Sequence, residues 1–437
     1  MATLHEKQCL SSSIAVVMVP YPAQSHMNLL LQFSHVVSSY DIPVHYVGSA
    51  VHNSQVKSRA SNPLHHLTKI HFHDFPVSLS PDISPPNTTT TSSKTNCNSE
   101  HQARRTEVST HLHEPFRMSF LYQTQKLSIS VFAGLAFRRG AFEPRDNNII
   151  PINDLPSVES CFPSAVVRNF IASQVRLSHF KAGELHNTCR AIEGTFIDQI
   201  LSERKMWAVG PLHLMTTNKE LVKDQDKWLL EWLDQQEPKS VLYISFGTIF
   251  TFSDEDIKEI ALGLEQSGVK FIWVLRDADK VNSLSNEEAR RPHLPDGFEK
   301  RMRGMGLVVR EWVAQVKILA HTSIGGFMSH CGWNSCMESI SMGVPIAACP
   351  MQSDQPMNAL LITEVLKVGV AVREWRQRDE LVTSSMISEA VRKLMASDEG
   401  EGMRKTAAEM GEKVKRSVAE GGDCCLEWDS FIAHITR

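Results

Sequence analysis

The stretch that decides the fold runs from residue 324 to residue 342 and reads IGGFMSHCGWNSCMESISM. Its first part, Ile324 to Met328, is short and apolar, as a buried strand is, and its last part has helical spacing through Glu338 and Met342. The residues between, His330 to Ser335, therefore lie at a strand-to-helix junction. Unpaired N–H groups and the positive end of the helix dipole meet at such a junction, which suits it to a phosphate.

The side chains of this junction allow two interpretations. Gly332 lets the main chain approach an anion, and neutral His330, Asn334 and Ser335 add donors for a diphosphate. Alternatively, Asn334 and Ser335 only cap the helix, which is the commoner role of such residues. These residues alone leave both interpretations open.

Strands and helices alternate on both sides of the junction. In the second half, apolar runs predict strands over residues 240–246, 271–275, 307–310, 324–328 and 344–349. Ser253 is the expected N-cap of a helix over 254–267. In the first half, strands are expected over residues 14–19, 44–48 and 66–75. This alternation predicts an α/β fold with parallel, doubly wound sheets.

The composition limits the class of protein. With 437 residues the chain has room for two or three domains, and its formal charge of −4 without a long basic block makes nucleic acid an unexpected partner. Nine cysteines, an odd number with no C-x2-C pair, indicate reduced thiols in a cytoplasmic protein. No run reaches about 18 apolar residues, so no stable membrane association is expected.

A change of pattern divides the chain. We expect an N-terminal domain over 1–210, a polar linker over 211–226 and a C-terminal domain over 227–420. Residues 421–437 have helical spacing and can return to the first domain.

The 44 residues from Trp312 to Gln355 are dense in polar, aromatic and glycine residues. In order and spacing this window resembles the plant secondary product glycosyltransferase box of the UDP-sugar glycosyltransferases. The resemblance is carried by Trp312, Gln315, His330-Cys331-Gly332-Trp333-Asn334-Ser335, Glu338, Pro345, Asp354 and Gln355. Within that family, Ala191–Gly194 and Ala320–Phe327 are most similar to the zeatin O-glucosyltransferase branch, whose acceptors are cytokinins.

The resemblance implies a GT-B fold, in which two Rossmann-like domains face a cleft and the second holds UDP-glucose or UDP-xylose. It also implies that Trp312 stacks on uracil and that Asp354 and Gln355 read the sugar hydroxyls, with Gln355 favouring glucose. The implied donor-binding set is Trp312, Gln315, His330, Gly332, Trp333, Asn334, Ser335, Glu338, Asp354 and Gln355. The chain departs from the box at Ala314, where relatives commonly carry proline, and we expect weaker preorganisation beside the uracil platform.

A second site is expected at His26, which follows the first predicted strand. The resemblance implies that this histidine is the general base of an inverting transfer to a hydroxyl of a small acceptor, most plausibly zeatin. Imidazole suits the role because its pKa lies near the operating pH. No metal, and no cofactor other than the UDP-sugar co-substrate, is expected, and the enzyme is expected to be a monomer.

The sequence between residues 118 and 153 has little similarity to the family. Relatives place an aspartate after a strand here, and its carboxylate orients the histidine; this strand–Asp segment is missing from the sequence. Glu143 or Asp146 can substitute only if the fold brings one of them to His26. The alternative function is therefore a UDP-sugar-binding protein with weak or no catalysis.

Overall fold

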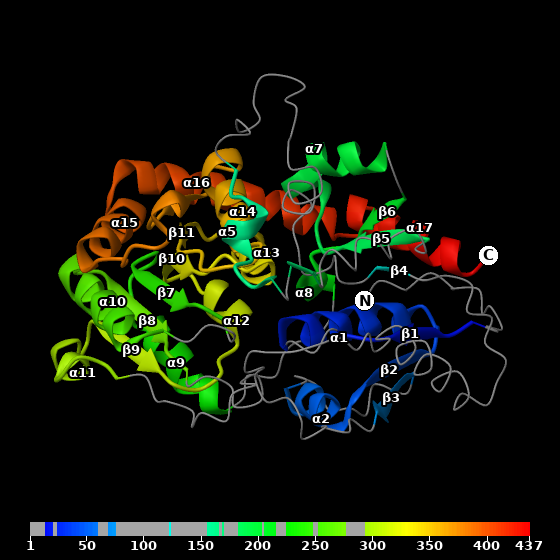
Figure 1. Ribbon diagram of the computed structural model, residues 1–437, viewed down its shortest axis with the longest axis horizontal. Coiled ribbons are helices and arrows are strands. Elements are labelled where there is room, and N and C mark those ends of the chain that lie inside the picture. Colours follow the sequence, from blue (N-terminus) through cyan, green and yellow to red (C-terminus); the bar gives the residue numbers. More distant parts are fainter. Residues whose placement is uncertain are drawn as a thin grey trace, which may run out of the picture.

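Two lobes of parallel strands and helices make up the described part of the chain (Figure 1). This computed structural model describes residues 14–20, 24–59, 69–75, 122–123, 155–165, 168–169, 182–202, 205–215, 224–247, 252–276 and 293–437. Glu143 and Asp146 lie outside these residues, as does most of the stretch from 118 to 153. Residues 78–99, whose Ser-, Thr-, Pro- and Asn-rich composition predicts a solvated loop, lie outside them too.

The second lobe contains one six-stranded parallel sheet in the order β12-β11-β10-β7-β8-β9. Its strands are β7 (Val241–Ser245), β8 (Lys270–Val274), β9 (Gly306–Val309), β10 (Ile324–Ser329), β11 (Ile346–Ala348) and β12 (Gly369–Ala371). The five strands predicted for this half are confirmed as β7 to β11, each within about two residues. Alternate residues of these strands face opposite sides of the sheet, and both sides are buried, as in other parallel sheets.

Helices cover both faces of this sheet. The face that carries Leu242 and Trp273 packs against α10 (Asp254–Ser267), α11 (Phe298–Arg301) and α15 (Ser384–Ala396). The face that carries Tyr243 and Phe327 packs against α9 (Asp224–Asp234), α12 (Gln315–Leu319), α13 (Trp333–Met342) and α16 (Asp398–Ser417). The sheet is therefore doubly wound, as the alternation of elements predicts.

The start of α10 confirms the predicted cap. The Ser253 hydroxyl accepts a hydrogen bond from the Asp256 N–H at 3.1 Å, and the Asp256 carboxylate accepts one from the Ser253 N–H at 3.0 Å. This reciprocal arrangement is a capping box. The helix ends at Gly268, whose φ of 66° suits a residue without a side chain.

The first lobe, like the second, is built from parallel strands and helices. Its described strands form two parallel sheets, β3-β2-β1 and β4-β5-β6. The strands are β1 (Val16–Met18), β2 (Val44–Ser49), β3 (Ile70–Phe75), β4 (Tyr122–Gln123), β5 (Gly183–His186) and β6 (Met206–Ala208), and the helices after β1 and β2 are α1 (Gln24–Ser39) and α2 (Ala50–Arg59). Among the described residues β1 pairs only with β2 and β4 only with β5, so no described strand joins the two sheets.

The predicted linker is partly helical. Leu212–Met215 forms α8, Leu212 is fully buried, and α9 already begins at Asp224. The linker is predicted over residues 211–226, and at its start the apolar Leu212 and Leu214 pack into the neighbouring cores. The connection between the lobes is thus anchored at its start.

Each lobe lends a helix to the other. α7 (Arg190–Leu201) belongs to the first half of the chain but packs against α16 of the second half. α17 (Asp423–Ile435) runs back onto the first lobe beside β6 (Figure 1), where Trp428 and Phe431 join the core that contains Phe33. The Phe33 and Trp428 ring centroids lie 5.0 Å apart. Such contacts bury large apolar areas across the boundary between the halves.

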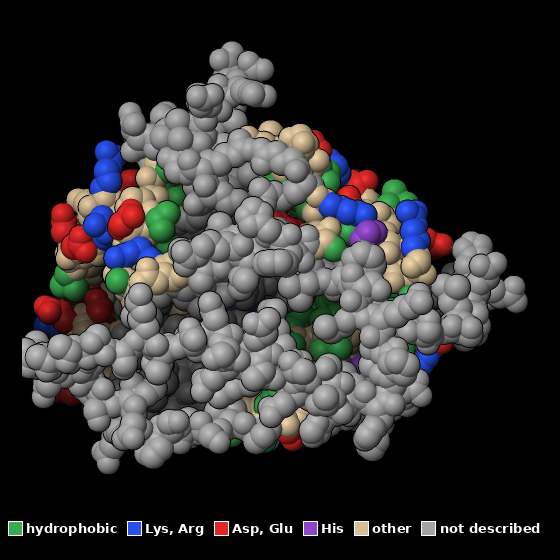
Figure 2. Space-filling view, turned by 45° about the vertical axis from the view of Figure 1, so that its right-hand side comes forward, with side chains coloured by type: hydrophobic (Ala, Val, Ile, Leu, Met, Phe, Trp, Pro, Cys, Tyr) green, Lys and Arg blue, Asp and Glu red, His purple; other side chains and the backbone are tan. Residues whose placement is uncertain are grey.

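Charges of both signs are intermingled on the described part of the face shown in Figure 2. Among the described residues, no helix has both the length and the apolar character needed to span a bilayer.

Candidate donor and acceptor site

The strand-to-helix junction at His330 has an unusual backbone. Cys331 follows the end of β10 and has a φ of 62°, in the left-handed region that side chains disfavour. Two hydrogen bonds hold it there: its N–H donates to Ser329 Oγ at 3.1 Å, and its carbonyl accepts from Asn358 Nδ2 at 3.0 Å. Gly332 is then the N-cap of α13, without a side-chain cap. The first turn of this ten-residue helix is therefore uncapped by side chains and suited to bind an anion.

The imidazole of His330 lies between two glycines. A Cβ added at Gly247 would lie 2.8 Å from His330 Nε2, and one added at Gly332 would lie 2.5 Å from the same atom. Burial lowers the pKa of His330 to about 4, against a smaller opposite effect from the Ser245 carbonyl. The ring is therefore neutral at physiological pH, and it can donate or accept a hydrogen bond without adding charge.

Residues predicted to bind the uridine end of the donor come together at the start of α12. Gln315 Nε2 donates to Glu338 Oε2 at 2.7 Å and to Ser335 Oγ at 3.1 Å. The half-buried Trp312 precedes this helix by three residues. The network orients the Glu338 carboxylate, which is the group a ribose diol requires as an acceptor.

Sequence reasoning missed the residue beneath this network. The Tyr243 ring is buried in β7, and its hydroxyl donates to Gln315 Oε1 at 3.3 Å. A tyrosine inside the apolar strand VLYIS was the available signal, because a buried phenol hydroxyl needs a partner.

The structure shows what the Trp333 side chain contacts, and it overturns the capping interpretation. The Trp333 indole is 1% exposed and donates from Nε1 to the Asn187 carbonyl of the first half at 2.9 Å, so its side chain joins the lobes, and its part in donor binding stays a prediction. Since Gly332 is the N-cap, Asn334 and Ser335 lie inside the first helical turn and do not cap it. The apolar bulk of the indole explains its place in the core.

The residues predicted to read the sugar lie at the start of α14 (Gln355–Leu360), which continues as the π-helix η5 (Leu361–Val365). Asp354 is the N-cap of α14, is nearly buried, and accepts from Asn358 Nδ2 at 2.7 Å. Burial raises the pKa of Asp354 to about 6, although the Asn358 hydrogen bond acts in the opposite direction. Gln355 Oε1 accepts from the Met351 and Gln352 N–H groups, which directs its Nε2 away from them.

Asn358 is a second residue that sequence reasoning missed. Its side-chain amide bonds both the Cys331 carbonyl and the Asp354 carboxylate. It therefore ties the predicted diphosphate turn to the predicted sugar-reading residue. It is fully buried, and nothing in its sequence position distinguishes it from a core residue of α14.

His26, the predicted base, lies in the first turn of α1, directly after β1 and residues 19–23. Burial lowers its pKa to about 4. The imidazole is therefore unprotonated above about pH 5 and is available to accept a proton, but it holds that proton weakly. A carboxylate beside it would raise the pKa.

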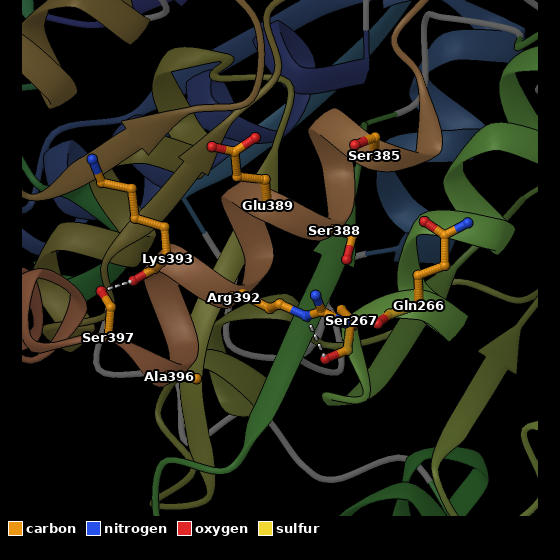
Figure 3. A pocket seen from close by; sticks show the side chains of 9 residues that line it. All are labelled: Gln266, Ser267, Ser385, Ser388, Glu389, Arg392, Lys393, Ala396 and Ser397. Carbon is orange, nitrogen blue, oxygen red and sulfur yellow. Dashed lines mark hydrogen bonds between the residues drawn. The ribbon is translucent and has the colours of Figure 1, made fainter.

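A separate surface hollow of about 870 Å³ lies between α10 and α15 (Figure 3). Both of its basic groups are engaged with the protein: Arg392 donates to the Gln266 and Ser267 carbonyls at the end of α10, and Lys393 pairs with Glu399 at 2.6 Å. None of the predicted site residues lines it. The described residues also contain no group of three or more His, Cys, Asp or Glu side chains that could hold a metal ion.

Comparison with known proteins shows to which family the chain belongs. The family model described as "Glycosyltransferase, N-terminal domain" matches residues 12–121 and 119–214, and "UDP-glucoronosyl and UDP-glucosyl transferase" matches residues 204–401. The chain belongs to the plant UDP-glycosyltransferase family. It is a glycosyltransferase of GT-B fold, as the box from Trp312 to Gln355 predicts.

Its relatives cover its whole length. This glycosyltransferase is 41% identical to zeatin O-glucosyltransferase of Phaseolus lunatus over 98% of both chains, and 40% identical to zeatin O-xylosyltransferase of Phaseolus vulgaris over 98% of this chain and 99% of that one. It is also similar in structure to Medicago truncatula UGT71G1, solved with UDP-glucose, with a TM-score of 0.72, 25% identity and coverage of 97% of this chain and 98% of that one.

The alignment with a relative also shows that this chain lacks some of the relative's residues. It extends over 459 positions with the Phaseolus lunatus enzyme, 22 more than the 437 residues of this glycosyltransferase. At least 22 positions of the relative therefore have no counterpart here. The N-terminal family model also matches in two pieces that meet at residues 119–121.

Proposed function

We propose that this glycosyltransferase moves glucose from UDP-glucose to the hydroxyl of zeatin, with inversion at the anomeric carbon and with UDP-xylose as the alternative donor. The observation that carries the proposal is the 41% identity to a zeatin O-glucosyltransferase over 98% of both chains. The nearly equal identity to a zeatin O-xylosyltransferase keeps xylose in the proposal.

The residues suggest how the transfer proceeds. The uridine end would lie against Trp312 with its ribose on Glu338, the diphosphate at His330 and the first turn of α13, and the sugar at Asp354 and Gln355. The acceptor oxygen would attack the anomeric carbon while an imidazole nitrogen of His26 takes its proton, and the bond to the diphosphate oxygen would break to release UDP. A positioned base of this kind contributes about 10²- to 10⁴-fold.

We also propose that the transfer is metal-independent, because the helix α13 terminus and neutral donors can stabilise the leaving diphosphate without a cation. The proposal further includes a monomer and a cytoplasmic location.

The low pKa of His26 makes the orienting acid important. One observation supports the idea that the strand–Asp segment is missing: at least 22 positions of the relative have no counterpart in this chain. A weakly basic His26 predicts a turnover below that of relatives that carry the acid.

Incubation of the enzyme with zeatin and either UDP-glucose or UDP-xylose, in buffer containing EDTA, tests the proposal. Mass detection should find the O-glucoside, and His26→Ala should lower the rate by about 10²-fold or more while leaving UDP affinity unchanged. His71→Ala, which removes an exposed histidine of β3, is the matched control and should keep full activity.

The result that would contradict catalysis is the absence of product even at stoichiometric enzyme. Calorimetric binding of UDP in that case would leave a sugar-nucleotide-binding protein, and failure to bind UDP would defeat the donor site as well.

A further inference from the structure

The short helix α5 (Val158–Cys161) comes from the first half of the chain but lies beside α14 of the second lobe (Figure 1). Two hydrogen bonds attach it there. The Ser353 N–H donates to the Cys161 carbonyl at 2.7 Å, and Trp375 Nε1, at the start of the 3₁₀ helix η6 (Trp375–Gln377), donates to Ser160 Oγ at 3.0 Å. The two family models divide these residues between the N-terminal and the C-terminal domain, so both bonds cross between domains.

The contact falls directly before the predicted sugar-reading residue. Ser353 has a φ of 65°, a conformation that a residue with a side chain keeps only where its surroundings hold it. Its N–H, the group that α5 engages, is one peptide unit from Asp354. If Ser353 relaxed to a right-handed conformation, the direction of the chain into α14 would change, and the Asp354 carboxylate would move with it.

The surroundings of α5 agree with a close approach to Asp354. The Cys161 side chain is fully buried, and the helix is itself braced, because Ser157 Oγ accepts from the Ser160 N–H and the Ser160 hydroxyl donates to the Ser157 carbonyl. Burial raises the pKa of the Cys161 thiol to about 12, and the Asp354 charge adds to this effect. A helix that is braced by its own hydrogen bonds and anchored by one buried side chain is a firm support for the loop that it touches.

We propose that α5 is a positioning element for the sugar end of the donor: through the Cys161 carbonyl and Ser160 it holds Ser353 left-handed, and thereby holds Asp354 against the sugar hydroxyls. This inference rests on the proposed function, in which Asp354 reads the sugar. The uridine and diphosphate contacts involve Trp312, Glu338 and His330, none of which takes part in the two hydrogen bonds that attach α5. Asp354 is linked to the diphosphate turn only indirectly, through Asn358. Loss of the α5 contact therefore weakens UDP-glucose binding more than UDP binding.

Two substitutions each remove the hydrogen bond between Trp375 and Ser160, one by deleting its donor and the other by deleting its acceptor. Trp375→Phe deletes the indole N–H and keeps an aromatic ring beside Arg378, while Ser160→Ala deletes the acceptor. The full-length protein is titrated calorimetrically, without acceptor, with UDP-glucose and separately with UDP. Each substitution should raise the Kd for UDP-glucose by about 3- to 10-fold, the range of a single hydrogen bond, and change the Kd for UDP by less than about 2-fold. Ser160→Ala also removes the hydrogen bond from the Ser160 hydroxyl to the Ser157 carbonyl. The double variant should therefore be no weaker than Ser160→Ala alone, because Trp375→Phe removes only a bond that Ser160→Ala has already removed.

The Ser353→Gly variant distinguishes the positioning role of α5 from a general structural role. Glycine adopts a φ of 65° without steric cost, so Trp375→Phe should lose most of its effect on UDP-glucose in the Ser353→Gly background. Trp228→Phe, at a half-exposed tryptophan on α9, is the matched control and should leave both Kd values unchanged.

Equal weakening of UDP and UDP-glucose, or unchanged UDP-glucose binding in both Trp375→Phe and Ser160→Ala, would overturn the role of α5 while the donor site stands. If the unsubstituted protein binds neither ligand, the proposed function itself fails, and the role of α5 fails with it.

Discussion

Gly247 contributes to the candidate donor site because it has no side chain. It has a φ of 76° at the end of β7, and its missing side chain makes room for the His330 ring. Gly332 makes room from the other side. The imidazole position thus depends on two glycines about 85 residues apart in sequence, which only the parallel pairing of β7 with β10 brings together.

Gly247→Ala should abolish most UDP binding, because the new Cβ would lie 2.8 Å from His330 Nε2 and would displace the ring. Calorimetric titration with UDP measures the loss, expected to exceed about 10-fold when a charge-assisted contact to the diphosphate is broken.

Gly268→Ala is the matched control. Gly268 has a similar φ of 66° but no atom within 4 Å of an added Cβ, so this change introduces the same backbone strain without a clash. Both variants should lose about 1 to 2 kcal/mol of stability, and only Gly247→Ala should lose UDP. Equal UDP affinity in the two variants would show that His330 does not hold the diphosphate.

At the scale of single residues, the sequence predicted the types of donor-site side chain better than their partners. Gln315, Ser335 and Glu338 meet as their shared box suggests, since helical spacing and a strand crossover place them at one sheet edge. Trp333 could not be placed, because an aromatic ring suits a ligand platform and a core equally well. Asn358 and Tyr243 were missed, because their roles arise only from neighbours distant in sequence.

Helix α12 begins where this chain departs from the glycosyltransferase box of its relatives. Ala314, its N-cap, has a φ of −74°, which is within the range of proline. Within the described residues the Ala314 N–H donates to no acceptor. The backbone is therefore already shaped for the residue that relatives commonly carry.

Ala314→Pro should raise the stability by about 0.4 to 1 kcal/mol, because proline restricts the unfolded chain more than the folded one. Urea unfolding of the two proteins measures the change.

Ala320→Pro provides the contrast. Ala320 closes the same helix with a φ of −75°, but its N–H donates to the Val316 carbonyl at 2.9 Å, so proline there should destabilise the protein. A loss of stability in Ala314→Pro would mean that the residue before it resists the conformation that proline imposes.

The elements of the second lobe were predictable because each is self-consistent. The strands are continuous apolar runs, and α10 carries its own capping box and its terminal glycine. In the first lobe the order of the described strands was less predictable, since it depends on which strands are next to each other in space. Helix α8 could not be predicted either, because it forms where Leu212 reaches a core that residues 211–226 do not reveal. The local sequence pattern determines where helices and strands form more firmly than it determines which of them are neighbours in space.

Three partly buried histidines make the stability of the folded protein depend on pH. Burial lowers the pKa of His26, His213 and His330 to about 4, from 6.5 in the unfolded chain. Between these values the unfolded state binds more protons, so stability rises with pH. The raised pKa values of Asp354 and Glu427 act in the opposite direction but involve fewer groups.

Stability should therefore fall as the pH falls from about 6.5 toward 4, with an uptake of roughly two protons on unfolding near pH 5, which is on the order of 2 kcal/mol per pH unit. Urea midpoints at pH 7, 6 and 5 measure the slope. His213→Gln removes one titrating group outside the proposed site and should flatten the curve by about one proton. A flat curve for the unsubstituted protein would show that these imidazoles are solvated.

The return of α17 to the first lobe has a consequence for how the chain is made. Trp428 and Phe431 complete a core whose other residues come mostly from β1, α1 and β2, and also from α2, β3, β5, β6 and α8. During synthesis that core stays open until α17 has left the ribosome, although its other members emerge first. A chaperone that shields apolar surface on nascent chains would thus be engaged by the amino-terminal lobe from the synthesis of β1 to that of α17, and a nonsense codon directly before α17 would leave this core incomplete although all of its other elements have been made.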